Sequence, residues 1–172
     1  MNNPKTILAI DPDIERSGFA LLDTQGRTFT MVQALTISEA VKTLDALAAG
    51  DDKPLVVIED SDTSTNWHVQ KLLASGYPLR RKLNTAAAIG RSAGLCHAII
   101  RVLREYAESV GLEVRMQKPL RKCWKGRDGK LTQAEAQQFM NGLPNRCNQE
   151  CRDAALIAWV VGNLPIRIRP TQ

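Results

Sequence analysis

The chain has 172 residues, of which 44% are hydrophobic and 24% are charged, and its formal net charge is +5. This length is enough for one domain with its own core, and we expect a single domain over residues 1–172. No apolar run approaches the ~20 residues that cross a bilayer, and no signal peptide is visible, so we expect a cytoplasmic protein without membrane contact.

The first part of the chain predicts four strands and one helix. Three short segments, rich in apolar residues and separated by turns, predict antiparallel strands: Lys5–Asp11, Ser17–Asp23 and Arg27–Leu35. Apolar residues at helical spacing predict a helix that begins at Ser38 and ends near Gly50. The continuous apolar run Leu55–Ile58 predicts a strand covered on both faces, and it ends in acids, as the first strand does.

The second part predicts three helices and one strand. Apolar residues predict a long helix from Thr85 to Glu108, in which Gly90 and Gly94 lie four residues apart. Each internal glycine lowers helix stability by roughly 1 kcal/mol, so we expect another element to pack closely there. A strand, a short helix and an Ala-rich helix follow: Leu112–Met116, Thr132–Met140 and Gln149–Val161. This order predicts an α/β layered domain, with a mixed five-stranded sheet flanked by helices.

The charge is divided unevenly along the chain. Residues 1–60 carry 5 basic and 10 acidic side chains (net −5), whereas residues 61–172 carry 18 basic and 8 acidic side chains (net +10). Seven basic residues and one acid, Asp128, lie within Arg115–Lys130, together with Trp124. Such a segment attracts a polyanion such as nucleic acid, and it is equally typical of a solvated surface loop.

The cysteines show no clear metal or disulfide pattern. They lack the paired short spacing of a zinc site and are expected to be free thiols: Cys96, Cys123, Cys147 and Cys151. Cys147 and Cys151 could lie one helical turn apart and bind a metal with His97, but the spacing favours free thiols.

Acids follow two predicted strands and begin the last helix. Asp11 and Glu59 end strands that would bring both acids to one edge of the sheet, and Glu150 and Asp153 share one face of a helical turn. Four converging carboxylates repel one another by several kcal/mol unless a cation lies between them. Oxygen ligands favour Mg²⁺ or Mn²⁺. Each acid alone has an ordinary structural explanation, but the four together favour a metal site.

Four segments of the sequence resemble the RuvC family of Holliday-junction resolvases, within the RNase H-like superfamily. They follow the family's order over nearly the whole chain: ILAIDPDIERSGFALLD, VVIED, AAAIGRSAGLCHAII and ECRDAALIAWVVG. The resemblance implies an RNase H-like fold and one nuclease domain over residues 1–172. The chain departs from the family at Asp13, where the family has glycine, and at Glu150, where relatives have aspartate or histidine.

The resemblance implies a crossover junction endodeoxyribonuclease of DNA recombination and repair, which resolves Holliday junctions or other branched DNA by phosphodiester hydrolysis. It implies two Mg²⁺ ions per site, for which Mn²⁺ would substitute, and a homodimer that cuts two strands. By position, Asp11 matches the family's first-strand aspartate and Glu59 its fourth-strand glutamate. Glu150 and Asp153 match the final helix pair. All four residues are implied to be catalytic and to bind metal.

Expected DNA contacts come from the resemblance and from the basic character of two segments. Trp67 lies in the neighbourhood where the family has an aromatic wedge, and a core or lid tryptophan is an equally good interpretation. Lys122 lies near a basic position that the family uses against DNA. The basic residues that would bind phosphates, or form a solvated face, are Lys71, Arg80, Arg81, Lys82, Lys118, Arg121, Lys122, Lys125, Arg127 and Lys130.

Other functions are compatible with parts of the sequence. A YqgF-like RNA nuclease shares the first strand and the final aspartate, and an inactive nucleic-acid-binding module of the same fold would share the basic surface. A sugar-kinase-like or actin-like phosphotransferase also opens with an acid-tipped strand, but it needs two such halves and glycine-rich phosphate loops. The sequence leaves open the type of branch, the cut-site preference and a cellular or phage origin.

Overall fold

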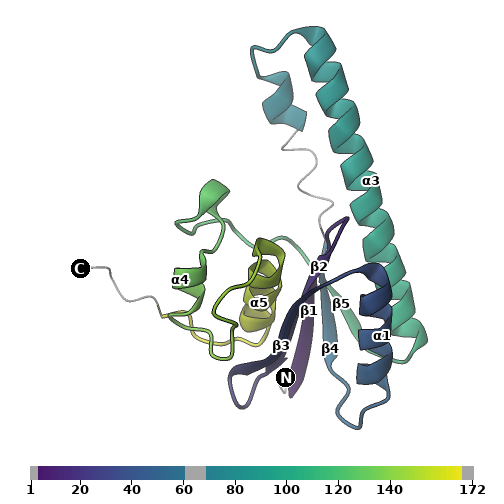
Figure 1. Cartoon of the computed structure of the whole chain (residues 1–172), viewed down its shortest axis with the longest axis vertical. Coiled ribbons are helices and arrows are strands. Elements are labelled where there is room, and N and C mark those ends of the chain that lie inside the picture. The colour runs from purple at the N-terminus through teal and green to yellow at the C-terminus, as the bar shows by residue number, and fades with distance from the viewer. Residues whose placement is uncertain (1–3, 61–68, 168–172) are drawn as a thin grey trace.

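The computed structural model describes residues 4–60 and 69–167 and contains one five-stranded sheet. The strands are β1 (Thr6–Asp11), β2 (Ser17–Asp23), β3 (Thr28–Leu35), β4 (Leu55–Glu59) and β5 (Val114–Gln117). Their order in the sheet is β3-β2-β1-β4-β5 (Figure 1). The first three strands pair antiparallel, whereas β1, β4 and β5 pair in parallel. The predicted mixed five-stranded sheet is therefore confirmed.

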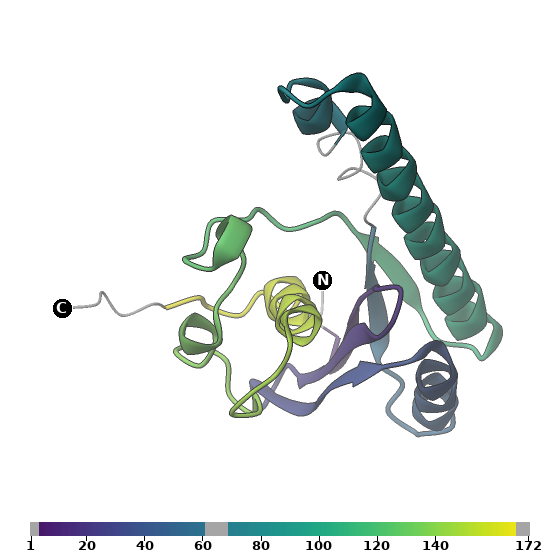
Figure 2. The same cartoon turned by 45° about the horizontal axis from the view of Figure 1, so that its top comes forward.

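Helices cover both faces of this sheet. They are α1 (Ile37–Ala48), α3 (Leu79–Ser109), α4 (Gln133–Ala136) and α5 (Gln149–Val161), with a short 3-10 turn at Arg127–Gly129. Figures 1 and 2 show α1 and α3 on one face of the sheet, and α5 on the other face with α4 beyond it. The fold is thus a layered α/β arrangement, as expected.

The central strands supply two separate cores. Ile7 and Ala9 of β1 face the layer of α5, whereas Leu8 and Ile10 face the layer of α1 and α3, and all four are fully buried. A strand that is covered on both faces is apolar at nearly every position, which explains the continuous runs in β1 and β4. Polar residues occur in these strands only at the first or last position.

Most predicted elements are confirmed within a few residues. α5 has the predicted bounds, and Thr132 caps α4 through the predicted capping box with Glu135. α1 begins at Ile37 and is capped by Thr36, rather than beginning at Ser38, because Thr36 and Glu39 satisfy each other's backbone donors. α4 ends at Ala136, earlier than predicted, and the chain then continues in turns.

The long helix differs most from the prediction. α3 begins at Leu79, six residues before the predicted Thr85. The prediction began too late because the first turns of α3 project beyond the sheet and carry no buried stripe (Figure 1). Among the described residues, it is the one helix that is long and apolar enough to cross a membrane, by length and composition only. A Cβ atom added at Gly90 or Gly94 would meet nothing within 4 Å. The element expected to pack there is therefore not found within the described part of this chain.

Candidate functional site

Two acids meet at one edge of the sheet because β1 and β4 are parallel neighbours. Their register aligns Ile10 with Ile58, so the next residues, Asp11 and Glu59, lie beside each other where the strands end. Both line a pocket of about 160 Å³, and Asp153 of α5 lines the same pocket. The structure therefore brings together three of the four predicted acids.

Asp153 reaches this pocket because α5 passes very close to β2. Gly18 pairs with Asp11 across the β1–β2 ladder, and a Cβ added at Gly18 would lie 2.1 Å from the Glu150 carbonyl oxygen. Any side chain at this position would push the first turn of α5 away from the strands. Gly18 thus helps to determine the separation between the acid of β1 and the acid of α5, and no pattern in the sequence marks it.

Burial and mutual repulsion raise the pKa of two of these acids. Burial is the largest cause for Asp11, whose pKa lies well above its ordinary value, and the charges of Glu59 and Asp153 act in the same direction. For Glu59, burial again comes first and the charge of Asp153 second in raising the pKa. A cation placed among the carboxylates would relieve this repulsion, and the oxygen donors suit a hard divalent ion. The residues present therefore fit the implied metal in charge and in donor type.

A lysine already lies beside one of the acids. Lys130 Nζ is 3.3 Å from Asp153 Oδ2, and Asp153 Oδ1 accepts a hydrogen bond from Gln149 Nε2 at 2.8 Å. In the described ranges, no group of three or more His, Cys, Asp or Glu side chains is placed to hold a metal ion as it stands. Metal binding through Oδ2 would require Lys130 to move away.

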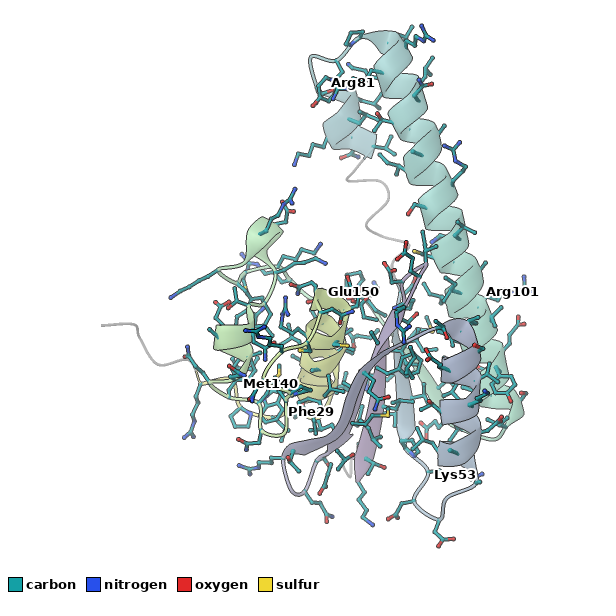
Figure 3. All side chains as sticks on the ribbon, viewed as in Figure 1. Phe29, Lys53, Arg81, Arg101, Met140 and Glu150 are labelled. Carbon is teal, nitrogen blue, oxygen red and sulfur yellow. The ribbon has the colours of Figure 1, made fainter. Side chains whose placement is uncertain are left out.

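The fourth predicted acid has a different position. Glu150 lies in the first turn of α5, as Figure 3 shows, but it is not among the residues that line the pocket. Its backbone carbonyl makes the close approach to Gly18. The role of Glu150 as a metal ligand stays a prediction.

The basic segment, residues 115–130, lies on the α5 side of the site. Three of its basic residues line the acidic pocket: Arg121, Lys122 and Lys130. The other predicted contacts in this segment do not line the pocket: Lys118, Lys125 and Arg127. Glu135 of α4 is 5% exposed, and its carboxylate accepts hydrogen bonds from the backbone nitrogens of Lys125 and Thr132. These hydrogen bonds hold the basic segment against α4.

The second basic group lies at the tip, residues 69–83, which comprises the start of α3 and the helical turn before it. The tip carries the remaining predicted phosphate contacts: Lys71, Arg80, Arg81 and Lys82. The Arg81 guanidinium lies 3.9 Å from the centre of the Tyr77 ring, and Lys82 Nζ donates to the Leu73 carbonyl at 2.8 Å. Figures 1 and 2 show the tip and the basic segment projecting beyond the same edge of the sheet, from opposite layers. Trp67 lies outside the described residues.

Trp124 and the four cysteines were also noted in the sequence. Trp124 lines the acidic pocket and stacks on Phe139 with ring centres 5.8 Å apart, a contact that the sequence did not indicate. The four cysteines are free, as expected, and Cys147 Sγ lies 3.2 Å from its hydrogen-bond acceptor, Gln133 Oε1. No described group of Cys and His side chains is arranged to bind a metal.

Comparisons with known proteins show the fold. No family model matches the sequence, and no curated protein gives a significant match. Two solved structures are similar over 92% and 91% of this chain and over 92% of their own: T. thermophilus RuvC in complex with a Holliday junction substrate, and Thermus thermophilus RuvC. Each has a TM-score of 0.53, with sequence identities of 10% and 11%. The chain therefore has the RuvC-like arrangement of the RNase H-like fold.

Proposed function

We propose that this chain is a metal-dependent endonuclease that resolves Holliday junctions or other branched DNA. The observation that carries the proposal is the placement of Asp11, Glu59 and Asp153 around one pocket whose other charged side chains are basic. Acids of this kind suit Mg²⁺ or Mn²⁺, and the basic side chains suit phosphates. The solved RuvC complex with a Holliday junction substrate supports branched DNA as the partner.

The acids and the lysines would have separate tasks in this reaction. Asp11, Glu59 and Asp153 would hold two metal ions, and Glu150 would complete a shell or orient water. When bound, the ions would activate water and stabilise the leaving 3′ oxygen. Lys122 and Lys130 would bind phosphate oxygens beside the acids. The expected products carry a 5′-phosphate and a 3′-hydroxyl.

A panel of DNA substrates tests the proposal. Labelled four-way, three-way, flap and duplex DNAs, together with structured RNA, are incubated with Mg²⁺ or Mn²⁺ and either the parent chain or Asp11→Asn. We expect the parent to cut branched DNA only with metal, and Asp11→Asn to bind the same DNA without cutting it. Binding without cutting by the parent would indicate an inactive module, and preferred cleavage of RNA would indicate the YqgF-like alternative. Equal cleavage by both proteins would contradict the assigned site.

The active form is expected to be a homodimer, for which α3 offers a surface. Exposed apolar or small residues recur along one side of this helix at spacings of three and four: Leu83, Ala87, Gly90, Gly94, Ala98 and Val102. Nothing lies within 4 Å of a Cβ added at either glycine, so a second backbone has room to approach. A two-fold axis through this stripe would bury it in both copies and provide two sites for two strands.

Gly94→Arg tests this dimer. The long charged side chain would occupy the space in which the second α3 is expected, so the variant should be monomeric at concentrations where the parent is a dimer. Size-exclusion chromatography with light scattering measures the mass. Gly76→Arg is the control, because Gly76 also has nothing within 4 Å of an added Cβ but lies before the stripe. A dimeric Gly94→Arg would rule out this interface.

A further inference from the structure

A chain of hydrogen bonds at the start of α5 ends on Asp153. Gln149 Nε2 donates to Asp153 Oδ1 at 2.8 Å, and Gln149 Oε1 accepts from Arg152 Nη2 at 2.7 Å. Gln149 lies three positions before Arg152 and four before Asp153, so its side chain can reach both. Because the amide oxygen of Gln149 accepts the hydrogen bond from the Arg152 guanidinium, Gln149 presents its NH₂ group, and not its oxygen, to Asp153.

Arg152 is itself anchored to the backbone. Its Nε donates to the Leu131 carbonyl at 3.1 Å, and its Nη1 donates to the Cys147 carbonyl. Gln149 Nε2 also lies 3.3 Å from the Leu131 carbonyl oxygen. Leu131 is 1% exposed and belongs to the core under α5. The amide that faces Asp153 is therefore held by groups that the core keeps in place.

This anchoring makes the two oxygens of Asp153 unequal. Oδ1 is held by Gln149, whereas Oδ2 faces Lys130, whose side chain is 36% exposed and joined to Asp153 by a single 3.3 Å contact. A lysine on a flexible stem can move to a phosphate more easily than an anchored glutamine can. Oδ2 is thus the oxygen that becomes available when Lys130 leaves.

We propose that Gln149 is a positioning residue, which holds Oδ1 so that Oδ2 of Asp153 is presented to a divalent metal ion. Arg152 acts through Gln149 by setting the orientation of its amide. The inference rests on the proposed metal-dependent function. A carboxylate that is already oriented loses less conformational freedom when it binds a metal, and groups that orient metal ligands typically change metal affinity or activity 10- to 100-fold.

Gln149→Met tests the proposal, because methionine has a similar length but can neither donate to Asp153 nor accept from Arg152. We expect Mn²⁺ to bind the variant roughly 10-fold more weakly than the parent, measured by titration calorimetry without DNA. Cleavage of a four-way junction should need correspondingly more Mn²⁺ but should reach the parental rate at saturation. A purely structural defect would lower that saturating rate instead.

Gln133→Met is the matched control. The Gln133 amide donates to the Pro144 carbonyl at 2.8 Å and accepts from Cys147, so it also fastens the chain near α5 but does not contact Asp153. Its Mn²⁺ affinity should equal that of the parent. Parental affinity in Gln149→Met, or the same loss in both variants, would overturn the proposal. A parent chain that binds no Mn²⁺ would instead overturn the proposed function, and this inference with it.

Discussion

The folded structure destabilises the charged form of Asp11. Burial and then the charge of Glu59 raise its pKa, so the folded chain binds this proton more tightly than the unfolded chain does. Below the ordinary value of about 4, the acid is protonated in both states and no penalty exists. The penalty grows as the pH rises from that value through the raised pKa. At neutral pH the acidic site therefore opposes folding, as functional sites often do.

Asp11→Asn should accordingly stabilise the metal-free protein at neutral pH. Asparagine keeps the shape of the side chain but removes its charge, and a gain of about 1 kcal/mol would raise the thermal midpoint by about 2–4 °C. The gain should shrink as the pH falls toward 4. Mg²⁺ should raise the midpoint of the parent but not that of the variant, as thermal unfolding would show.

Asp51→Asn is the control for this experiment. Asp51 is exposed and lies in the turn before β4, at the opposite edge of the sheet, so its replacement should change neither the midpoint nor the effect of Mg²⁺. A metal-free Asp11→Asn that is less stable than the parent at neutral pH would contradict the repulsion described for the site.

The individual residues of the site were predictable to different degrees. The positions of Asp11 and Glu59 in the site could be predicted because the ends of neighbouring strands meet at one edge of the sheet. The position of Asp153 could be predicted because it lies near the start of a helix that covers the sheet. Lys130 was predicted only as a DNA contact, since its pairing with Asp153 joins two segments that no local pattern connects. The four-residue spacing of Gln149 and Asp153 was a usable signal for their hydrogen bond.

At the scale of elements, the site depends on how closely α5 packs on β2. Gly18→Ala should lower the free energy of unfolding by about 1–3 kcal/mol, because the added Cβ would overlap backbone atoms of α5 that cannot turn aside. The same displacement should move Asp153 relative to Asp11 and weaken Mn²⁺ binding. Denaturant unfolding and titration calorimetry measure the two effects.

Gly50→Ala is the control for this packing. A Cβ added at Gly50 would meet its nearest atom at 3.6 Å, which is an ordinary contact, so stability and metal binding should stay near the parental values. Parental stability in Gly18→Ala would show that α5 can move without cost and that this glycine does not set the geometry of the site.

The elements themselves were predictable where both sides of a segment are buried. β1 and β4 gave continuous apolar runs because α1 and α3 cover one face and α5 covers the other. The first turns of α3 were not predicted, because none of their residues is buried. Leu79 and Leu83 are exposed there, so no periodic stripe of buried residues indicates a helix. Exposed helical turns leave little pattern in the sequence.

At the scale of the whole molecule, the tip and the basic segment project beyond the same edge of the sheet from opposite layers of the fold (Figure 2). A straight duplex that follows the basic segment need not reach the tip, whereas the arms of a branched DNA extend in several directions. We therefore expect the tip to contribute to the selection of branched DNA, and the basic segment to contribute to binding of any DNA.

The double variant Arg80→Gln, Arg81→Gln tests this division. It should weaken binding to a four-way junction and reduce the slope of log affinity against log salt by up to about 2, because two phosphate contacts are removed. Duplex affinity should change little. Fluorescence anisotropy across a range of salt concentrations measures both affinities.

The matched control removes two charges at the far edge of the sheet. Arg27→Gln with Lys53→Gln alters the β2–β3 turn and the approach to β4, so junction affinity and its salt slope should stay close to those of the parent. An equal loss in both double variants would indicate that only the net charge matters. An equal loss of duplex and junction binding in the tip variant would argue against selection by the tip.

The direct pairing of β1 with β4 has a consequence for how such a protein can evolve. Strand register, and not the link between β4 and α3, determines where Asp11 and Glu59 meet. That link can lengthen or exchange its side chains while Asp11 and Glu59 stay side by side. New substrate preferences can thus arise by drift in one connection, and a designer can graft a link from a distant homologue without rebuilding the chemistry.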